Sequence, residues 1–68
     1  MTIYLLDYAA AELLRIHVHE KTQKVIEDKY NGDVEDYLND HEDFFGVRMS
    51  DCHFMVVDDD IDFRDFEI

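Results

Sequence analysis

Two histidines, His17 and His19, have the types and spacing that could bind a metal ion. They alternate along an apolar segment, so both imidazoles would lie on one side of a strand, where zinc or nickel can bind. His41, Cys52 and His53 are ligands by type, but no spacing brings them near, and the CxxC and HExxH patterns are absent. We therefore expect a solvated strand face, with no metal and no other cofactor.

A second candidate site is the aspartate cluster Asp58, Asp60 and Asp62, which matches positions one, three and five of a calcium-binding loop. The match then fails, because position six is Phe63 where the loop requires glycine. The bidentate glutamate at position twelve would lie beyond residue 68. We expect weak divalent binding at most.

Catalytic groups are hard to assemble from this sequence. General acid–base catalysis needs carboxyl groups in a water-poor cleft, whereas the carboxylates here fall on a helix face and a turn. Cys52 and His53 are adjacent, and neighbours on a strand point to opposite faces, so they form no dyad. We expect Cys52 to be a small core residue and the protein not to be an enzyme.

The strongest signal in the sequence is its charge. Eighteen acidic and six basic residues give a formal net charge of −12. Residues 1–29 hold five acids and four bases, whereas residues 30–68 hold thirteen acids and two bases. Such a chain is repelled by anionic lipid and by nucleic acid, so we expect a basic protein partner, with neither direct nucleic-acid binding nor membrane binding.

One expected helix concentrates these acids. Asp33 is a suitable N-cap, and at 100° per residue the side chains of Val34, Tyr37, Leu38, Phe44 and Phe45 gather on one side. The carboxylates occupy the remaining surface: Asp33, Glu35, Asp36, Asp40, Glu42 and Asp43. Gly46 ends this helix. We expect one apolar face and one acidic face.

The acidic face carries unrelieved repulsion. No lysine or arginine occurs from residue 30 to 47, and the last three acids lie near the negative end of the helix dipole. Six carboxylates over roughly 16 Å compare with about ten phosphate charges on the same length of DNA duplex. A second cluster of six spans residues 58–67. We expect the carboxylates beyond residue 30 to form one fixed, outward-facing array, with Tyr37 or the phenylalanines adding stacking contacts.

The remaining elements predict an α+β fold: a small antiparallel sheet, made of a hairpin plus C-terminal strands, with two short helices packed on one face. Residues 4–6 and 14–19 indicate the hairpin, although Ala9, Ala10 and Ala11 leave a single helix over residues 4–19 as an alternative. Thr22 is expected to cap a helix reaching about Tyr30, with Val25 and Ile26 turned inward. Residues 53–57 predict a central strand, residues 58–60 a turn, and residues 61–68 a bulged or shortened strand.

Length and cysteine content set further limits. Sixty-eight residues make a single domain over 1–68 with a thin core. A single cysteine allows no intrachain disulfide, which fits a reducing, cytoplasmic location. The apolar run at residues 3–6 has no basic flank and is too short for a signal peptide or a membrane span.

In size, acidity and single cysteine the chain resembles small phage-encoded anti-CRISPR proteins of the DNA-mimic type. The residues that carry the resemblance are Asp33, Glu35, Asp36, Asp40, Glu42 and Asp43, together with Asp58, Asp59, Asp60, Asp62 and Asp65. The resemblance implies that these residues bind a basic surface of a CRISPR effector in the host cytoplasm and exclude target DNA. The nearly neutral first 29 residues depart from a uniformly acidic mimic.

Two functional hypotheses follow. In the first, the protein occupies a basic nucleic-acid-binding surface of a partner through charge mimicry. In the second, it is a small adaptor or antitoxin-like module whose partner is basic for another reason. In both, long-range attraction speeds the encounter and buried contacts set the lifetime of the complex.

Overall fold

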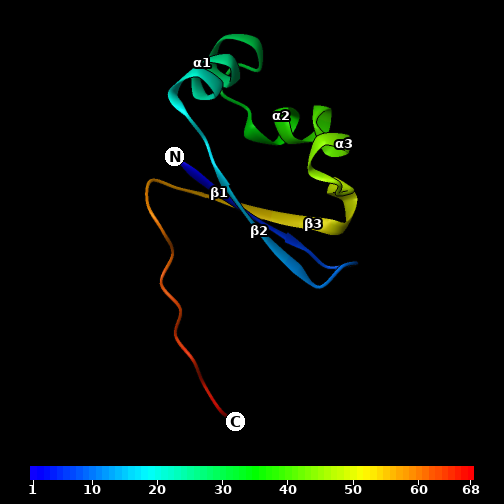
Figure 1. Ribbon diagram of the computed structural model, residues 1–68, viewed down its shortest axis with the longest axis vertical. Coiled ribbons are helices and arrows are strands. Elements are labelled where there is room, and N and C mark those ends of the chain that lie inside the picture. Colours follow the sequence, from blue (N-terminus) through cyan, green and yellow to red (C-terminus); the bar gives the residue numbers. More distant parts are fainter.

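The computed structural model describes residues 1–68 as a three-stranded sheet with helices on one face (Figure 1). Strand β1 (Thr2–Asp7) lies between β2 (Glu12–His17) and β3 (Cys52–Val57), and both pairings are antiparallel. The predicted α+β class is therefore confirmed. The expectation that residues 53–57 form the central strand is wrong, because β1 holds that position. Its side chains are buried on both faces at Ile3, Tyr4 and Leu5.

The β1–β2 hairpin is confirmed, and the alternative of one helix over residues 4–19 is wrong. Its turn lacks glycine and is organised by the buried Asp7, whose carboxylate accepts hydrogen bonds from Ala9 N–H (3.0 Å) and Ala10 N–H (3.2 Å). Ala11 takes a left-handed conformation with φ 52°. The hydrogen bonds of the Asp7 side chain thus stabilise a turn in which alanine occupies the left-handed position that usually favours glycine.

Helix α1 (Glu20–Lys29) begins two residues before Thr22, with His19 at the N-cap, so the predicted Thr22 cap is wrong. Ile26 is buried as expected, whereas Val25 is 38% exposed. The helix ends where Asn31 and Gly32 adopt positive φ values and Gly32 N–H donates to the Ile26 carbonyl at 2.9 Å.

The single helix predicted from residue 33 is two helices. Helix α2 (Val34–Asp40) ends at His41, and the one-turn helix α3 (Glu42–Phe45) follows and ends at Gly46. His41 N–H donates to the Leu38 carbonyl, three residues back, so the α-helical hydrogen bonding is interrupted there. Asn39 and Asp40 precede the break and are poor helix formers. A 3₁₀ turn, η1 (Met49–Asp51), leads into β3.

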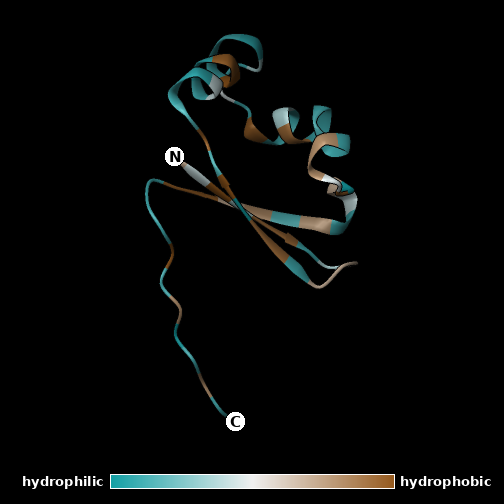
Figure 2. Ribbon diagram, viewed as in Figure 1, coloured by the Kyte–Doolittle hydropathy of each residue, from teal (hydrophilic) through white to brown (hydrophobic).

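The core lies between the sheet and the helices. It is formed by residues from β1, α1, α2 and the connecting segments: Ile3, Leu5, Val18, Ile26, Leu38 and Val47. Ile3, Leu5 and Leu38 have no solvent exposure. In Figure 2, β1 is coloured mostly as hydrophobic, whereas the helices include hydrophilic stretches. Leu14 and Ile16 pack against this core from β2, as the alternation of that strand predicts.

Residues 58–68, called the acidic tail here, form no strand after the chain bends at Asp58 and Asp59. The expected bulged strand is therefore absent. Its apolar residues change parity between Phe63 and Phe66, so a straight strand could not bury them on one face. The tail extends away from the body in Figure 1, and the molecule measures 45 × 25 × 15 Å.

Candidate functional site

The acidic surface rests on α2, which is fixed at its start and at its middle. The Asp33 carboxylate accepts a hydrogen bond from Asp36 N–H at 3.2 Å, which confirms the predicted N-cap. One turn later Leu38 is completely buried against the sheet. The carboxylates of this helix are therefore held on a backbone that is anchored in the core.

Three carboxylates of this segment, Asp33, Asp36 and Asp40, form what we call the aspartate row. They are spaced by three and four residues, which places their side chains on one flank of the helix, and all three residues are exposed. Asp40 also accepts a hydrogen bond from the Tyr30 hydroxyl at 2.9 Å. The aspartate row thus runs along α2, and its last residue, Asp40, is hydrogen-bonded to Tyr30, the C-cap residue of α1.

The other three predicted contact residues of this segment lie elsewhere. Glu35 points toward β3, and the half-buried Glu42 accepts a hydrogen bond from Met49 N–H at 2.6 Å. Asp43 is exposed on α3, beyond the break at His41. Glu42 therefore helps to hold η1 in place, and its carboxylate is engaged inside the molecule.

An aromatic cluster borders the aspartate row. The rings of Tyr37 and His41 stack with centroids 4.1 Å apart, and Tyr30 meets Tyr37 edge-on at 5.6 Å. The hydrogen bond to Asp40, followed by desolvation, raises the pKa of Tyr30. Of these residues the sequence had indicated only Tyr37. The i, i+4 spacing of Tyr37 and His41 was the available signal for the stacked pair.

Phe44 was predicted to lie on the apolar face, and this prediction is wrong. The side chain is 81% exposed, while its neighbour Phe45 packs against the core and meets Phe44 edge-on at 5.1 Å. The helix break at His41 changes the direction of the following turn, so the helical wheel does not continue through it. An exposed aromatic ring therefore stands beside Asp43 on α3.

The second predicted cluster, in the acidic tail, lies on the other side of the sheet. Its Asp60 accepts a hydrogen bond from the Tyr4 hydroxyl at 3.0 Å, and Ile61 N–H donates to the same hydroxyl oxygen at 3.3 Å. Tyr4 points away from the helices, because it alternates with the core residues Ile3 and Leu5. The carboxylates beyond residue 30 thus form two separate surfaces, and the expectation of one array is wrong. The predicted contact residues Asp58, Asp59, Asp62 and Asp65 are exposed in this tail.

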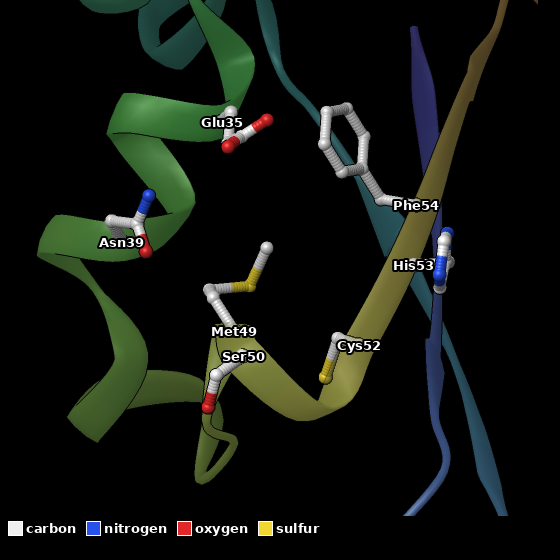
Figure 3. A pocket seen from close by; sticks show the side chains of 7 residues that line it. All are labelled: Glu35, Asn39, Met49, Ser50, Cys52, His53 and Phe54. Carbon is white, nitrogen blue, oxygen red and sulfur yellow. The ribbon is translucent and has the colours of Figure 1, made fainter.

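A pocket of about 460 Å³ lies between α2 and β3 (Figure 3). Its lining comes from α2, η1 and β3: Glu35, Asn39, Met49, Ser50, Cys52, His53 and Phe54. Desolvation and then the nearby carboxylates, Asp7 first, raise the pKa of the Cys52 thiol, so the thiol stays protonated at neutral pH. The imidazole of His53 is 5.2 Å from the Tyr8 ring on the opposite face of the strand. The pocket therefore brings no thiolate and base together.

The metal candidates of the sequence are dispersed. No group of three or more His, Cys, Asp or Glu side chains is arranged to hold a metal ion. His17 is the last residue of β2 and His19 is the N-cap of α1, so the two histidines do not share a strand face. Asp58, Asp60 and Asp62 lie in the tail, where Asp60 is bonded to Tyr4.

No family model, no curated protein and no solved structure matches this chain. None of the helices has the length and apolar character needed to cross a membrane.

Proposed function

We propose that this protein is an acidic binding protein that occupies a basic, nucleic-acid-binding surface of another protein, and that α2 and α3 form the contact. One observation carries the proposal. Between Asp33 and Asp43 the chain has six carboxylates and no lysine or arginine, and all of these carboxylates except Glu42 belong to exposed residues along α2 and α3, with Leu38 anchoring α2 in the core. Such a surface attracts cationic partners and gains affinity when they neutralise it.

The spacing of the aspartate row supports mimicry of a nucleic-acid strand. Three charges between Asp33 and Asp40 occupy about 10 Å of helix. One strand of DNA carries a charge every ~3.4 Å of axis, so the two charge densities are of the same order. A groove lined by lysine and arginine for a phosphate backbone would therefore also attract this flank.

Aromatic rings, of which Phe44 is exposed and Tyr37 and His41 are half-buried, supply a second kind of contact. Phe44 projects from α3 beside Asp43, and the Tyr37–His41 stack borders the aspartate row. Aromatic side chains in nucleic-acid grooves stack on bases, and arginine guanidinium groups pack on aromatic faces. Phe44 is thus the proposed anchor within a charged rim, the arrangement found at the centres of many protein interfaces.

On the resemblance to anti-CRISPR proteins, the proposed partner is a CRISPR effector subunit. The two proteins would bind each other in the cytoplasm of the host cell. The groove that receives target DNA in such an effector is a positively charged channel. Binding of α2 in this groove would exclude the DNA by direct competition.

A second function is favoured by the separation of the two acidic surfaces. The acidic tail lies across the sheet from α2, so the charges do not follow one continuous line as they do along a duplex. A small adaptor or antitoxin-like module, which uses α2 on a partner that is basic for another reason, fits this arrangement too. The two functions differ in whether DNA competes for the partner.

The test compares two variants with equal charge changes. Changing Asp36, Asp40 and Asp43 to Lys should abolish capture of the partner, whereas changing Asp58, Asp59 and Asp62 to Lys should leave it within a few-fold. Capture should also weaken steeply with salt, because the contact is dominated by charge. Capture that survives the first triple change would exclude α2 and α3 as the contact.

Competition then separates the two functions. The partner is recovered from lysate by the tagged protein and challenged with duplex DNA. Elution of a nucleic-acid-binding protein by DNA supports the mimic, and a partner that DNA does not elute supports the regulatory module.

A further inference from the structure

The sheet has a second face, opposite the helices, that no helix covers. On this open face Leu6 lies beside Leu13 of β2, and Tyr4 lies beside Met55 of β3. Leu6, Leu13 and Met55 are 41–47% exposed, although they are large apolar side chains. Together with Tyr4 and Ile61 they line an apolar groove of about 250 Å³. The groove leaves apolar surface in contact with water, which is unfavourable.

The acidic tail carries large apolar side chains that are mostly exposed to water, and the Phe66 ring is approached by the guanidinium of Arg64 from the same tail, 5.3 Å from its centroid. Phe63 is 69% exposed, Phe66 is 75% exposed and Ile68 is fully exposed. Only the root of the tail touches the open face, through the hydrogen bonds of Asp60 and Ile61 with Tyr4. Beyond this root the tail leaves its own sheet, and its apolar residues extend away from the body (Figures 1 and 2).

Charge on the two elements is complementary. Among the strand residues, alternation places Arg15, His17 and His53 and no carboxylate on the open face, where Asp60 of the tail root also binds the Tyr4 hydroxyl. The Arg15 guanidinium lies 5.7 Å from the Tyr4 ring centroid. The tail presents Asp62, Asp65 and Glu67, together with the base Arg64, between its apolar residues, so this stretch has a net negative charge. An apolar face that carries the charge of Arg15 therefore matches an apolar segment of net negative charge.

We propose that the open face binds the tail of a second copy of this chain, so that two copies exchange their tails in a two-fold symmetric dimer. The tail is rooted on the open face and points outward from it. Two copies that meet through their open faces therefore each place a tail across the sheet of the other. Such an exchange is reciprocal, as a two-fold interface requires. The aspartate row lies on the other side of the sheet and stays accessible, so this inference does not depend on the proposed function.

The area available is sufficient for a specific interface. A buried phenylalanine contributes about 150–250 Å², so the four rings of two exchanged tails contribute about 600–1,000 Å². The sheet residues that they cover contribute a comparable area. The sum exceeds the ~1,000 Å² that separates specific interfaces from incidental contacts. The dimer must also overcome repulsion between two chains of net charge −12, which the placement of most carboxylates away from the open face limits.

The test is the association state of the full chain in sedimentation equilibrium at physiological salt. The unaltered protein should form dimers with increasing concentration. Replacing both tail phenylalanines (Phe63→Ser with Phe66→Ser) should weaken dimerisation at least tenfold, and so should replacing two face residues (Leu13→Ser with Met55→Ser). The control is Phe44→Ser, which removes a ring of similarly high exposure outside the interface and should leave the dimer unchanged.

Mixing the two double variants distinguishes exchange between chains from folding of the tail onto its own sheet. A tail variant with an intact face and a face variant with an intact tail can form a heterodimer through one tail–face contact. A fluorescent label on one variant should therefore report heterodimers at concentrations where neither variant self-associates. An unaltered protein that stays monomeric, or a mixture without heterodimers, would overturn the inference.

Discussion

Two segments of this protein have nearly the same composition and very different structures. Residues 33–45 and residues 58–68 each contain six carboxylates, and they contain five and four large apolar residues, respectively. The first forms α2 and α3 and anchors in the core, whereas the second forms the acidic tail. Composition and charge therefore did not determine which segment formed helices.

The difference lies in the spacing of the apolar residues and in the start signal. Val34, Tyr37 and Leu38 repeat at helical spacing after an N-cap, so one side of α2 can be buried. In the tail, Ile61 and Phe63 share one parity while Phe66 and Ile68 share the other, and no face gathers them all. Repulsion among carboxylates is tolerated where a regular apolar face compensates for it.

The largest effect should come from removing the anchor of α2. Leu38→Ala deletes a side chain with no solvent exposure, and we expect a loss of about 2–5 kcal/mol in the free energy of unfolding. In a domain of this size such a loss leaves much of the population unfolded. Denaturant titration followed by circular dichroism measures the change.

The matched change in the tail is Phe66→Ala. This residue is 75% exposed, so in the monomer we expect a change within about 0.5 kcal/mol. A loss of similar size in both variants would show that the tail is as well packed as α2, contrary to the comparison.

The sequence was sufficient to predict the elements whose apolar periodicity is regular. The hairpin, β3, the Asp33 cap and the Gly46 stop were predicted because each has a local signal. The break at His41 was not predicted, because weak helix formers lower the stability of a helix without determining the residue at which it ends. The central position of β1 depends on pairing between distant segments, which no local pattern specifies.

The acidic surface was predictable in composition but not in arrangement. Charge counting located the carboxylates, yet the bonds of Glu42 to η1 and of Asp60 to Tyr4 connect residues distant in sequence. Phe44 lies on α3, beyond the helix break, where the helical wheel of α2 does not apply. The two hydrogen bonds are tertiary contacts, which a helical wheel does not include.

A smaller effect should distinguish two aspartates that make the same kind of bond. Asp33 accepts from the Asp36 N–H at the start of α2, and Asp59 accepts from the Asp60 N–H in the tail. Asp33→Ala should lower the free energy of unfolding by about 1 kcal/mol, because a helix N–H loses its cap. Asp59→Ala should change it by less than about 0.5 kcal/mol, because no helix depends on that bond. Equal losses, measured by thermal unfolding at neutral pH, would contradict the distinction.

The smallest effect concerns the Tyr30–Asp40 hydrogen bond, which ties α1 to the end of the aspartate row. This bond is the main cause that raises the pKa of Tyr30 above its ordinary value of 10.0. The folded state therefore keeps the phenol proton at a pH where the unfolded state has released it. The resulting stabilisation is complete below pH 10.0 and is lost as the pH rises through the raised pKa of the folded state.

Asp40→Asn removes the charge that holds the proton, so the Tyr30 ring should titrate at lower pH than in the unaltered protein. The alkaline loss of stability should also become shallower, because the folded and unfolded pKa values approach each other. The Tyr30 ring resonances, followed by NMR from about pH 9 to 12, measure the first effect directly. Asp43→Asn is the control, because it removes an equal charge from α3 without touching the Tyr30 hydroxyl. If both variants shift the titration equally, the cause is the general acidic field of α2 and α3, and Asp40 is then as free as its neighbours to meet a cationic partner.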